Sequence, residues 1–189
     1  LNGPPGTGKT SIIIKNMVKE LIANKKSILV LAYTNRAVDE LCEAINHACE
    51  GGSERNFIRF GSWLSTGIEY QGNLLDVVME EREKELLASG KRFGRAEVAS
   101  ILKENNVYVS TVASIGSKEH IFQVKNFDYI IVDEASQILE PQLVGILGKA
   151  STFVLIGDHK QLPAISLQSV KRSKTNNRLL ESIGLYNRK

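Results

Sequence analysis

The chain has 189 residues, of which 42% are hydrophobic and 24% charged, with a formal net charge of +3. This composition is ordinary for a soluble globular protein and excludes a disordered chain. No apolar run approaches the roughly 20 residues that a membrane-spanning helix needs, and so weak a positive charge does not by itself indicate a nucleic-acid partner. We expect one domain with a packed core and at most a small insertion.

The first ten residues, LNGPPGTGKT, contain a complete phosphate-binding loop motif. The motif G-x-x-x-x-G-K-[ST] is matched without exception from Gly3 to Thr10. Its glycines let successive backbone N–H groups turn toward a phosphate, and a helix beginning near Lys9 adds its positive dipole end. Lys9 should reach the β- and γ-phosphates, and the Thr10 hydroxyl should bind Mg²⁺. The predicted nucleoside triphosphate site comprises Gly3, Pro4, Pro5, Gly6, Thr7, Gly8, Lys9 and Thr10.

Two predicted helices flank a short apolar strand after this loop. Apolar residues recur at helical spacing over 9–24 and 35–49, and the run SILVLA at 27–32 is typical of a strand buried on both faces. Because a phosphate loop normally follows a buried strand, we expect Leu1 and Asn2 to be the end of a strand that the sequence cuts short.

Residues 61–106 interrupt the alternation of strands and helices. They follow a predicted strand, FIRF at 57–60, and contain two helix-prone segments, 74–88 and 95–104. We interpret the region as an inserted helical hairpin. Its dense charge is most simply a solvated face, and contact with a partner or substrate is the alternative.

The alternation resumes after the insertion. Apolar runs predict strands at 107–111, 129–132 and 152–156, and a last helix is expected at 178–183. Between the second and third of these strands we expect short helical segments interrupted by Pro141.

This order of elements predicts an α/β fold of the P-loop NTPase type. Strands that alternate with helices form a mostly parallel sheet with helices on both faces. We therefore expect residues 1–60 and 107–189 to form a nucleotide-binding domain and residues 61–106 to form a helical insertion. Ligands of such sheets bind at the carboxyl ends of the strands.

Two acids, Asp133 and Glu134, follow the apolar run that ends at Val132. An acid at this position, beside a phosphate loop, is placed to hold Mg²⁺ opposite Thr10. Glu134 is then a candidate base for the attacking water, which implies hydrolysis as well as binding. The alternative is a pair of acids that only stabilise the start of a helix.

Weaker signals come from a glutamine and from the two cysteines. Gln161, in the turn after the next strand, is a candidate γ-phosphate contact, although a polar surface loop would look the same. Cys42 and Cys49 lie seven residues apart on a predicted helix, about 10 Å along its axis, which is too far for a disulfide. Two free thiols are expected, and a zinc site with His47 lacks a fourth ligand. Free thiols favour a reducing compartment, the cytoplasm or, in a eukaryote, the nucleus.

Five motifs occur in an order that resembles superfamily 1 helicases. They are GPPGTGKT from Gly3, TNRAVDEL from Thr34, VSTVAS from Val109, VDEASQ from Val132 and GDHKQLPA from Gly157, and they resemble motifs I, Ia, Ic, II and III. The second and fourth look most like the 5′-to-3′ branch that contains the nonsense-mediated-decay helicase.

The resemblance implies the first RecA-like motor domain of an ATP-dependent helicase that moves on single-stranded DNA or RNA. It implies that Asp133 binds Mg²⁺, that Glu134 is the catalytic base and that Gln161 contacts the γ-phosphate of ATP. It also implies a path for the single strand along Thr34, Asn35, Ser110 and Thr111. As bare residues, these four are more often helix caps and strand ends.

A second RecA-like domain and its arginine finger are not found in this sequence. Because such a finger contributes about 10³ to 10⁵ in rate, we predict that the chain alone hydrolyses ATP at well below ~1 s⁻¹. Two alternatives remain open, a nucleotide-switched binding module and a P-loop ATPase that acts on a protein partner. The presence of Glu134 argues against a pure switch.

Overall fold

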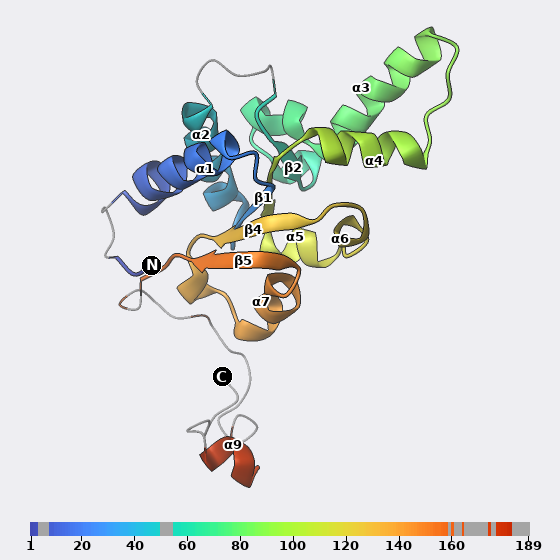
Figure 1. Cartoon of the computed structure of the whole chain (residues 1–189). Helices are drawn as coiled ribbons and strands as arrows, with labels where there is room; N and C mark the ends of the chain where they lie inside the picture. Colours follow the sequence, from blue (N-terminus) through green and yellow to red (C-terminus); the bar gives the residue numbers. More distant parts are fainter. Residues whose placement is uncertain are drawn as a thin grey trace.

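The computed structural model describes residues 1–3, 8–49, 55–158, 160, 164, 174 and 177–182, with only the backbone of Lys9 and Thr10. Figure 1 shows a central sheet with helices on both faces and a pair of helices that projects from one end. No helix among these residues is long and apolar enough to cross a membrane.

Over the described residues the sheet has five parallel strands in the order β2-β3-β1-β4-β5. Its central strand is wholly apolar because neighbouring strands and helices cover it on every side. Ile28 pairs with Val107 of one neighbour and with Tyr129 of the other. The predicted α/β fold with a parallel sheet is confirmed. The strands are β1 (Ile28–Ala32), β2 (Ile58–Phe60), β3 (Val107–Thr111), β4 (Phe127–Val132) and β5 (Ala150–Leu155).

Alternate residues of each strand enter two separate apolar clusters. Leu29 and Leu31 of β1 face one cluster, whereas Ile28, Val30 and Ala32 face the other. The second cluster is closed by η1 (Lys9–Ile14), α1 (Lys15–Ala23) and α2 (Asn35–Ala48). The first is closed by α5 (Val112–Gly116), α6 (Ile121–Val124) and α7 (Glu140–Leu147), together with buried residues of the helices between β2 and β3.

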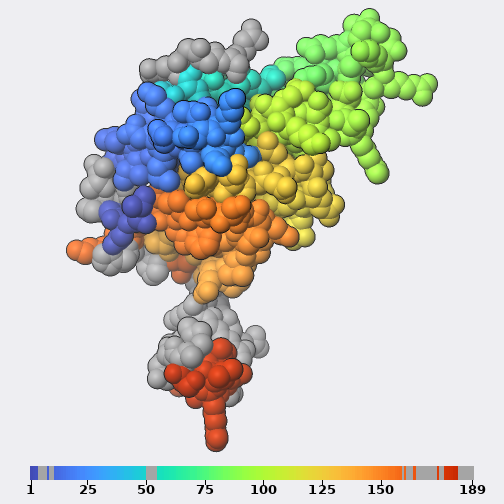
Figure 2. All heavy atoms as spheres, in the orientation of Figure 1, coloured from blue at the N-terminus to red at the C-terminus, as the bar shows by residue number. Residues whose placement is uncertain are grey.

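The chain start lies beside the end of β5. Asn2 forms a parallel bridge with Gly157, the Gly3 N–H donates to the Gly157 carbonyl at 3.1 Å, and the Gly157 N–H donates to the Leu1 carbonyl at 3.1 Å. Figure 2 shows these first residues, in dark blue, against the orange surface of β5. The phosphate loop motif therefore begins at the carboxyl edge of the sheet.

The region between β2 and β3 begins with two short 3₁₀ helices, η2 (Trp63–Ser65) and η3 (Ile68–Asn73). The helices α3 (Leu75–Ala88) and α4 (Arg95–Glu104) follow and form the projecting arm in Figures 1 and 2. Arg82 of α3 pairs with Glu104 of α4 at 2.8 Å. Both predicted helices of the hairpin are present; the domain boundaries at 61 and 106 stay a prediction.

Two details differ from the sequence-based expectations. The first predicted helix opens as a π-helical turn, Lys9–Ile14, before it becomes α-helical. The expectation that Pro141 interrupts a helix is wrong. Pro141 occupies the first turn of α7, where its missing N–H leaves no hydrogen bond unmade. The last described helix, α9 (Arg178–Ser182), lies within the predicted range 178–183, of which residue 183 is outside the described residues.

Candidate functional site

The candidate site residues gather where the parallel strands end. Asp133 follows β4, Gly157 and Asp158 follow β5, Thr111 ends β3, and Thr34 lies just after β1. Because all five strands run the same way, these positions share one edge of the sheet. We call Gly3, Gly8, Asp133, Glu134 and Asp158 the nucleotide end of this edge, and Thr34, Arg59, Gly67 and Ser110 the β2 end.

Gly8 has a backbone that only glycine adopts without strain. Its φ of 72° and ψ of 28° are left-handed, and a Cβ built there would lie 2.7 Å from Cδ1 of Ile12. The Gly8 carbonyl accepts the N–H of Ile12 at 2.8 Å and so starts the helix. Residues Pro4, Pro5, Gly6 and Thr7 and the side chains of Lys9 and Thr10 lie outside the described residues. Their predicted phosphate and Mg²⁺ contacts stay predictions.

Asp133 is buried at the end of β4, with 3% of its surface exposed. Its N–H donates to the Leu31 carbonyl at 2.8 Å, so the ladder between β1 and β4 fixes its backbone. Its Oδ1 accepts the N–H of Glu134 at 2.9 Å. This carboxylate is held at a defined place beside the start of the phosphate loop.

Glu134 has a strained backbone with φ 51° and ψ 35°, in the left-handed region. Such a conformation costs a residue with a side chain about 1–3 kcal/mol, and it persists only where the surroundings enforce it. Here the Ala135 N–H donates to the Ile156 carbonyl at 2.8 Å, and the Gln137 N–H donates to the Glu134 carbonyl at 2.9 Å. Strain of this kind concentrates at functional positions, which supports a role for Glu134 beyond starting a helix.

A second buried acid, Asp158, was missed by sequence reasoning. It is 3% exposed, and its Oδ1 accepts the Lys160 N–H at 2.9 Å, whereas Oδ2 has no hydrogen-bond partner among the described residues. Gly157 lets its loop approach the one after β4, because a Cβ there would lie 3.1 Å from the Ser136 nitrogen. The signal was present, since Asp158 follows an apolar strand as Asp133 does. Gln161, the predicted γ-phosphate contact, lies outside the described residues.

The four predicted strand-contacting residues divide into an exposed pair and a buried pair. Thr34 and Asn35 are exposed at the start of α2, where Thr34 Oγ1 accepts the Ala37 N–H at 3.1 Å. Thr111 caps α5 by accepting the Ser114 N–H at 3.1 Å. The Ser110 hydroxyl is fully buried and donates to the Phe60 carbonyl at 3.2 Å and to the Thr111 carbonyl at 2.9 Å.

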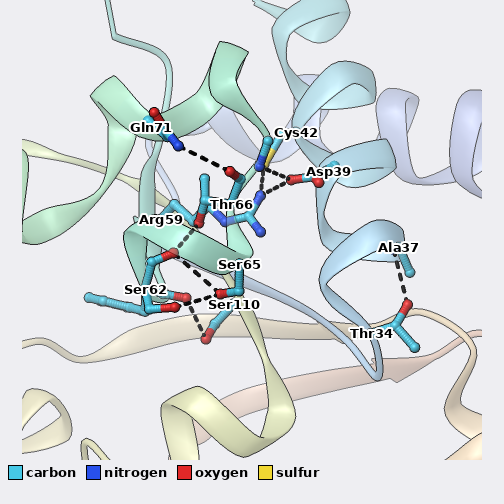
Figure 3. A network of polar contacts seen from close by, with 12 residues as sticks. Thr34, Ala37, Asp39, Cys42, Arg59, Ser62, Ser65, Thr66, Gln71 and Ser110 are labelled. Atoms are coloured by element: carbon cyan, nitrogen blue, oxygen red, sulfur yellow. Dashed lines mark hydrogen bonds and ion pairs between the residues drawn. The ribbon is translucent and has the colours of Figure 1, made fainter.

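An ion pair between a buried arginine and a partly exposed aspartate lies at the β2 end (Figure 3) and was not predicted from the sequence. Arg59, in the middle of β2, is 1% exposed, and its Nη1 contacts Oδ1 of Asp39 on α2. The same Nη1 lies 3.8 Å from Sγ of Cys42. Burial raises the pKa of the Cys42 thiol to about 12, so this sulfur stays neutral and Asp39 carries the balancing charge. A charged residue inside the strand FIRF was the available signal.

The described residues contain no cluster of three or more His, Cys, Asp or Glu side chains that could hold a metal ion. Cys42 and Cys49 are both free, as predicted. An all-protein zinc site is therefore not part of the described structure. Mg²⁺ in nucleotide sites needs only one or two carboxylates besides the phosphates, a requirement that Asp133 meets.

Comparison with known proteins identifies the family. The profile of the AAA domain family matches residues 1–70 and 69–169. The DNA replication ATP-dependent helicase/nuclease dna2 of Schizosaccharomyces pombe is 34% identical over 174 residues, which are 92% of this chain and 11% of that protein. The DNA replication ATP-dependent helicase/nuclease JHS1 of Arabidopsis thaliana is 35% identical over 86% of this chain and 11% of its own length.

The human protein of this kind, DNA replication ATP-dependent helicase/nuclease DNA2, is 32% identical over 90% of this chain. The match covers 15% of the human protein, so the chain spans a small part of the relatives that it matches. The family match runs through every motif from the phosphate loop to Gln161. The chain therefore belongs to the AAA domain family, and it is a motor domain of the superfamily 1 helicase type.

Proposed function

We propose that this domain couples ATP hydrolysis to movement along single-stranded DNA. The observation that carries the proposal is the shared edge of the sheet, where the phosphate loop begins beside two buried acids and an exposed helix start lies on the same edge. DNA is favoured over RNA because the relatives are named for DNA replication.

At the nucleotide end, each residue has one proposed role. Lys9 and the loop amides bind the phosphates of ATP. Asp133 and Thr10 would hold Mg²⁺, which when bound neutralises charge on the β- and γ-phosphates. Glu134 accepts a proton from the attacking water, and its enforced backbone keeps the carboxylate oriented for this task. Gln161 senses the γ-phosphate, and a second RecA-like domain supplies the missing arginine.

At the β2 end, Thr34 and Asn35 are the proposed contacts to the DNA backbone, because both are exposed. Hydroxyl and amide groups position a strand through its phosphates without reading its sequence. Ser110 and Thr111 belong to the same proposed path. Their hydroxyls hold the ends of β2 and β3 and the start of α5, so their effect on DNA is expected to pass through the backbone. Two free cysteines fit a reducing compartment, the cytoplasm or nucleus.

The test is single-turnover ATP hydrolysis by the protein that joins this domain to its proposed second RecA-like domain, with protein in excess over ATP, in the absence and presence of oligo(dT) or oligo(rU). We expect oligo(dT) to accelerate hydrolysis, and Lys9→Ala to abolish it. Alanine at Thr34 and Asn35 should preserve ATP binding and remove the acceleration. A rate lost in Lys9→Ala but indifferent to both oligonucleotides would refute the DNA motor and favour the ATPase with a protein partner.

A further inference from the structure

The ion pair between Asp39 and Arg59 links two elements that border the proposed DNA path. Asp39 lies in the second turn of α2, the helix that starts with Asn35 after its cap Thr34. Arg59 lies in β2, 20 residues along the chain. Its Nε and Nη2 have no hydrogen-bond partner among the described residues, so the contact with Asp39 is the main polar anchor of this buried cation.

The same carboxylate also holds the segment that follows β2. The Gly67 N–H donates to Oδ1 of Asp39 at 3.4 Å, and a Cβ built on Gly67 would lie 3.2 Å from Oδ2. Within the segment, Thr66 Oγ1 donates to the Ser62 carbonyl at 2.8 Å. The Gln71 amide donates to the carbonyl of Trp63 at 3.2 Å. Asp39 therefore attaches α2 to a segment with its own internal hydrogen bonds (Figure 3).

The strand β2, from which this segment continues, is attached to β3. Ser110 donates its hydroxyl to the carbonyl of Phe60, the last residue of β2. The start of α2 and the end of β3 are thus joined through Arg59, Gly67 and Phe60. The exposed pair Thr34 and Asn35 and the buried pair Ser110 and Thr111 stand on the two sides of this connection.

Stability alone is a poor explanation for the pair. Removing a charge such as that of Arg59 from water costs several kcal/mol, and apolar residues of similar volume often stabilise a fold equally well. The pair does impose a fixed geometry, since Asp39 receives donors from β2 and from the following segment at once. Apolar side chains in place of Asp39 and Arg59 could fill the same volume but would not fix the orientation of α2.

We propose that Asp39 and Arg59 are positioning residues for DNA binding. Their ion pair holds the first turn of α2 and the segment 61–74 as one rigid surface, so that Thr34 and Asn35 meet the strand at a fixed distance from β3. The inference rests on the proposed function and adds to it two residues that need not touch DNA. The nucleotide end is not part of this connection.

The experiment uses the double variant Asp39→Asn/Arg59→Met, which removes both charges and leaves no buried ion unpaired. Oligo(dT) affinity is measured by anisotropy of a labelled strand, and nucleotide affinity with a fluorescent ATP analogue. We expect the dissociation constant for oligo(dT) to rise about tenfold, a typical size for coupling between sites, with nucleotide affinity unchanged. The matched control is Arg82→Met/Glu104→Gln, which removes the ion pair between α3 and α4 and should change neither affinity.

A second variant covers the case in which the double variant does not fold. Gly67→Ala keeps both charges and pushes a Cβ against Asp39, and it should weaken oligo(dT) binding about threefold. Trp63 is the only tryptophan, half-exposed in the same segment, so its emission reports whether DNA binding alters this surface. Emission from Trp63 should change when oligo(dT) binds the wild-type chain.

The outcomes separate the two proposals. Wild-type oligo(dT) affinity in a folded double variant overturns the positioning role and leaves the DNA motor standing. An equal loss of nucleotide and oligo(dT) affinity means general loosening and also overturns the positioning role. Failure of the wild-type chain to bind oligo(dT) overturns both.

Discussion

The nucleotide end and the β2 end lie on one edge of the same sheet but are assembled differently. At the nucleotide end, Asp133 and Glu134 come directly after β4, and the N–H groups of Asp133 and Ala135 bond to the carbonyls of Leu31 and Ile156. At the β2 end, Arg59 depends on a partner 20 residues away on a helix. The first arrangement is formed by residues that are close together in the sequence, whereas the second forms only when α2 packs on the sheet.

The difference predicts distinct consequences of mutation. A change of the Glu134 side chain at the nucleotide end should alter chemistry and leave the fold intact, because hydrogen bonds of the neighbouring backbone hold this turn. Changes at the β2 end should alter stability and DNA affinity together, because a buried charge loses its partner.

The largest expected effect is on hydrolysis. Glu134→Gln removes the proposed base, so the rate should fall about 10²- to 10⁴-fold, while ATP binding and the melting temperature stay near wild type. Rapid-quench measurement of single-turnover hydrolysis checks this. Glu140→Gln, at an exposed glutamate six residues further on, is the control and should hydrolyse at the wild-type rate. Full activity in Glu134→Gln would show that Glu134 is not the base.

The next effect is on stability at the β2 end. Asp39→Asn leaves the charge of Arg59 buried without a counter-ion, and the free energy of unfolding should fall by about 3 kcal/mol. Adding Arg59→Met should restore most of the loss. Urea unfolding followed by circular dichroism measures both. Glu40→Gln breaks only the exposed pair with Arg36, and it should change the free energy of unfolding by less than about 0.5 kcal/mol.

A smaller effect is expected where the phosphate loop meets its helix. Gly8→Ala places a Cβ in a left-handed backbone and against Ile12, so the free energy of unfolding should fall by about 1–2 kcal/mol. Gly145→Ala is a control of opposite sign. Gly145 lies inside α7 with nothing within 4 Å of a Cβ, so alanine should stabilise the chain by about 0.5–1 kcal/mol. Equal effects at the two glycines would contradict the left-handed geometry of Gly8.

The smallest effect depends on pH. The pKa of Cys42 is about 12 in the folded chain, above the ordinary value of 9.0, because burial disfavours the thiolate. As pH rises from 9.0 toward 12, the unfolded thiol loses its proton and the folded thiol keeps it, so stability falls. Between about pH 8 and 10, wild type should lose about 1 kcal/mol relative to Cys42→Ala. If urea unfolding gave the two proteins the same change in stability between about pH 8 and 10, the raised pKa of Cys42 would be refuted.

Much of the fold was predictable because apolar runs mark buried strands. All five strands were predicted, with shifts of up to two residues at their ends. The start of β4 was predicted at residue 129 because Asp128 breaks the apolar run. The strand in fact begins at Phe127, and the Asp128 carboxylate accepts the Ser27 N–H. The order of the strands was beyond sequence reasoning, since it depends on pairings such as Ile28 with Val107 between distant segments.

The candidate site was predictable where a motif is contiguous. The placement of Asp133 and Glu134 follows from their position after β4, but the left-handed backbone of Glu134 has no signature in the sequence. Ser110 looked like a surface contact and is fully buried, because β2 pairs alongside the end of β3 and Ser110 bonds to the Phe60 carbonyl. Asp39 sits inside a recognised motif, yet its partner lies on another element and is set by tertiary packing.

The pairing of β1 with β3 spans the segment that carries the α3–α4 arm. The chain entropy lost in closing such a loop grows only with the logarithm of its length, and each doubling costs about 0.6 kcal/mol. The arm can therefore be lengthened, shortened or replaced at little thermodynamic cost, provided that its buried residues at the base are kept. Those residues are Leu75, Val78, Ile101 and Leu102. A different arm could be attached at this point of the sheet without displacing the nucleotide end.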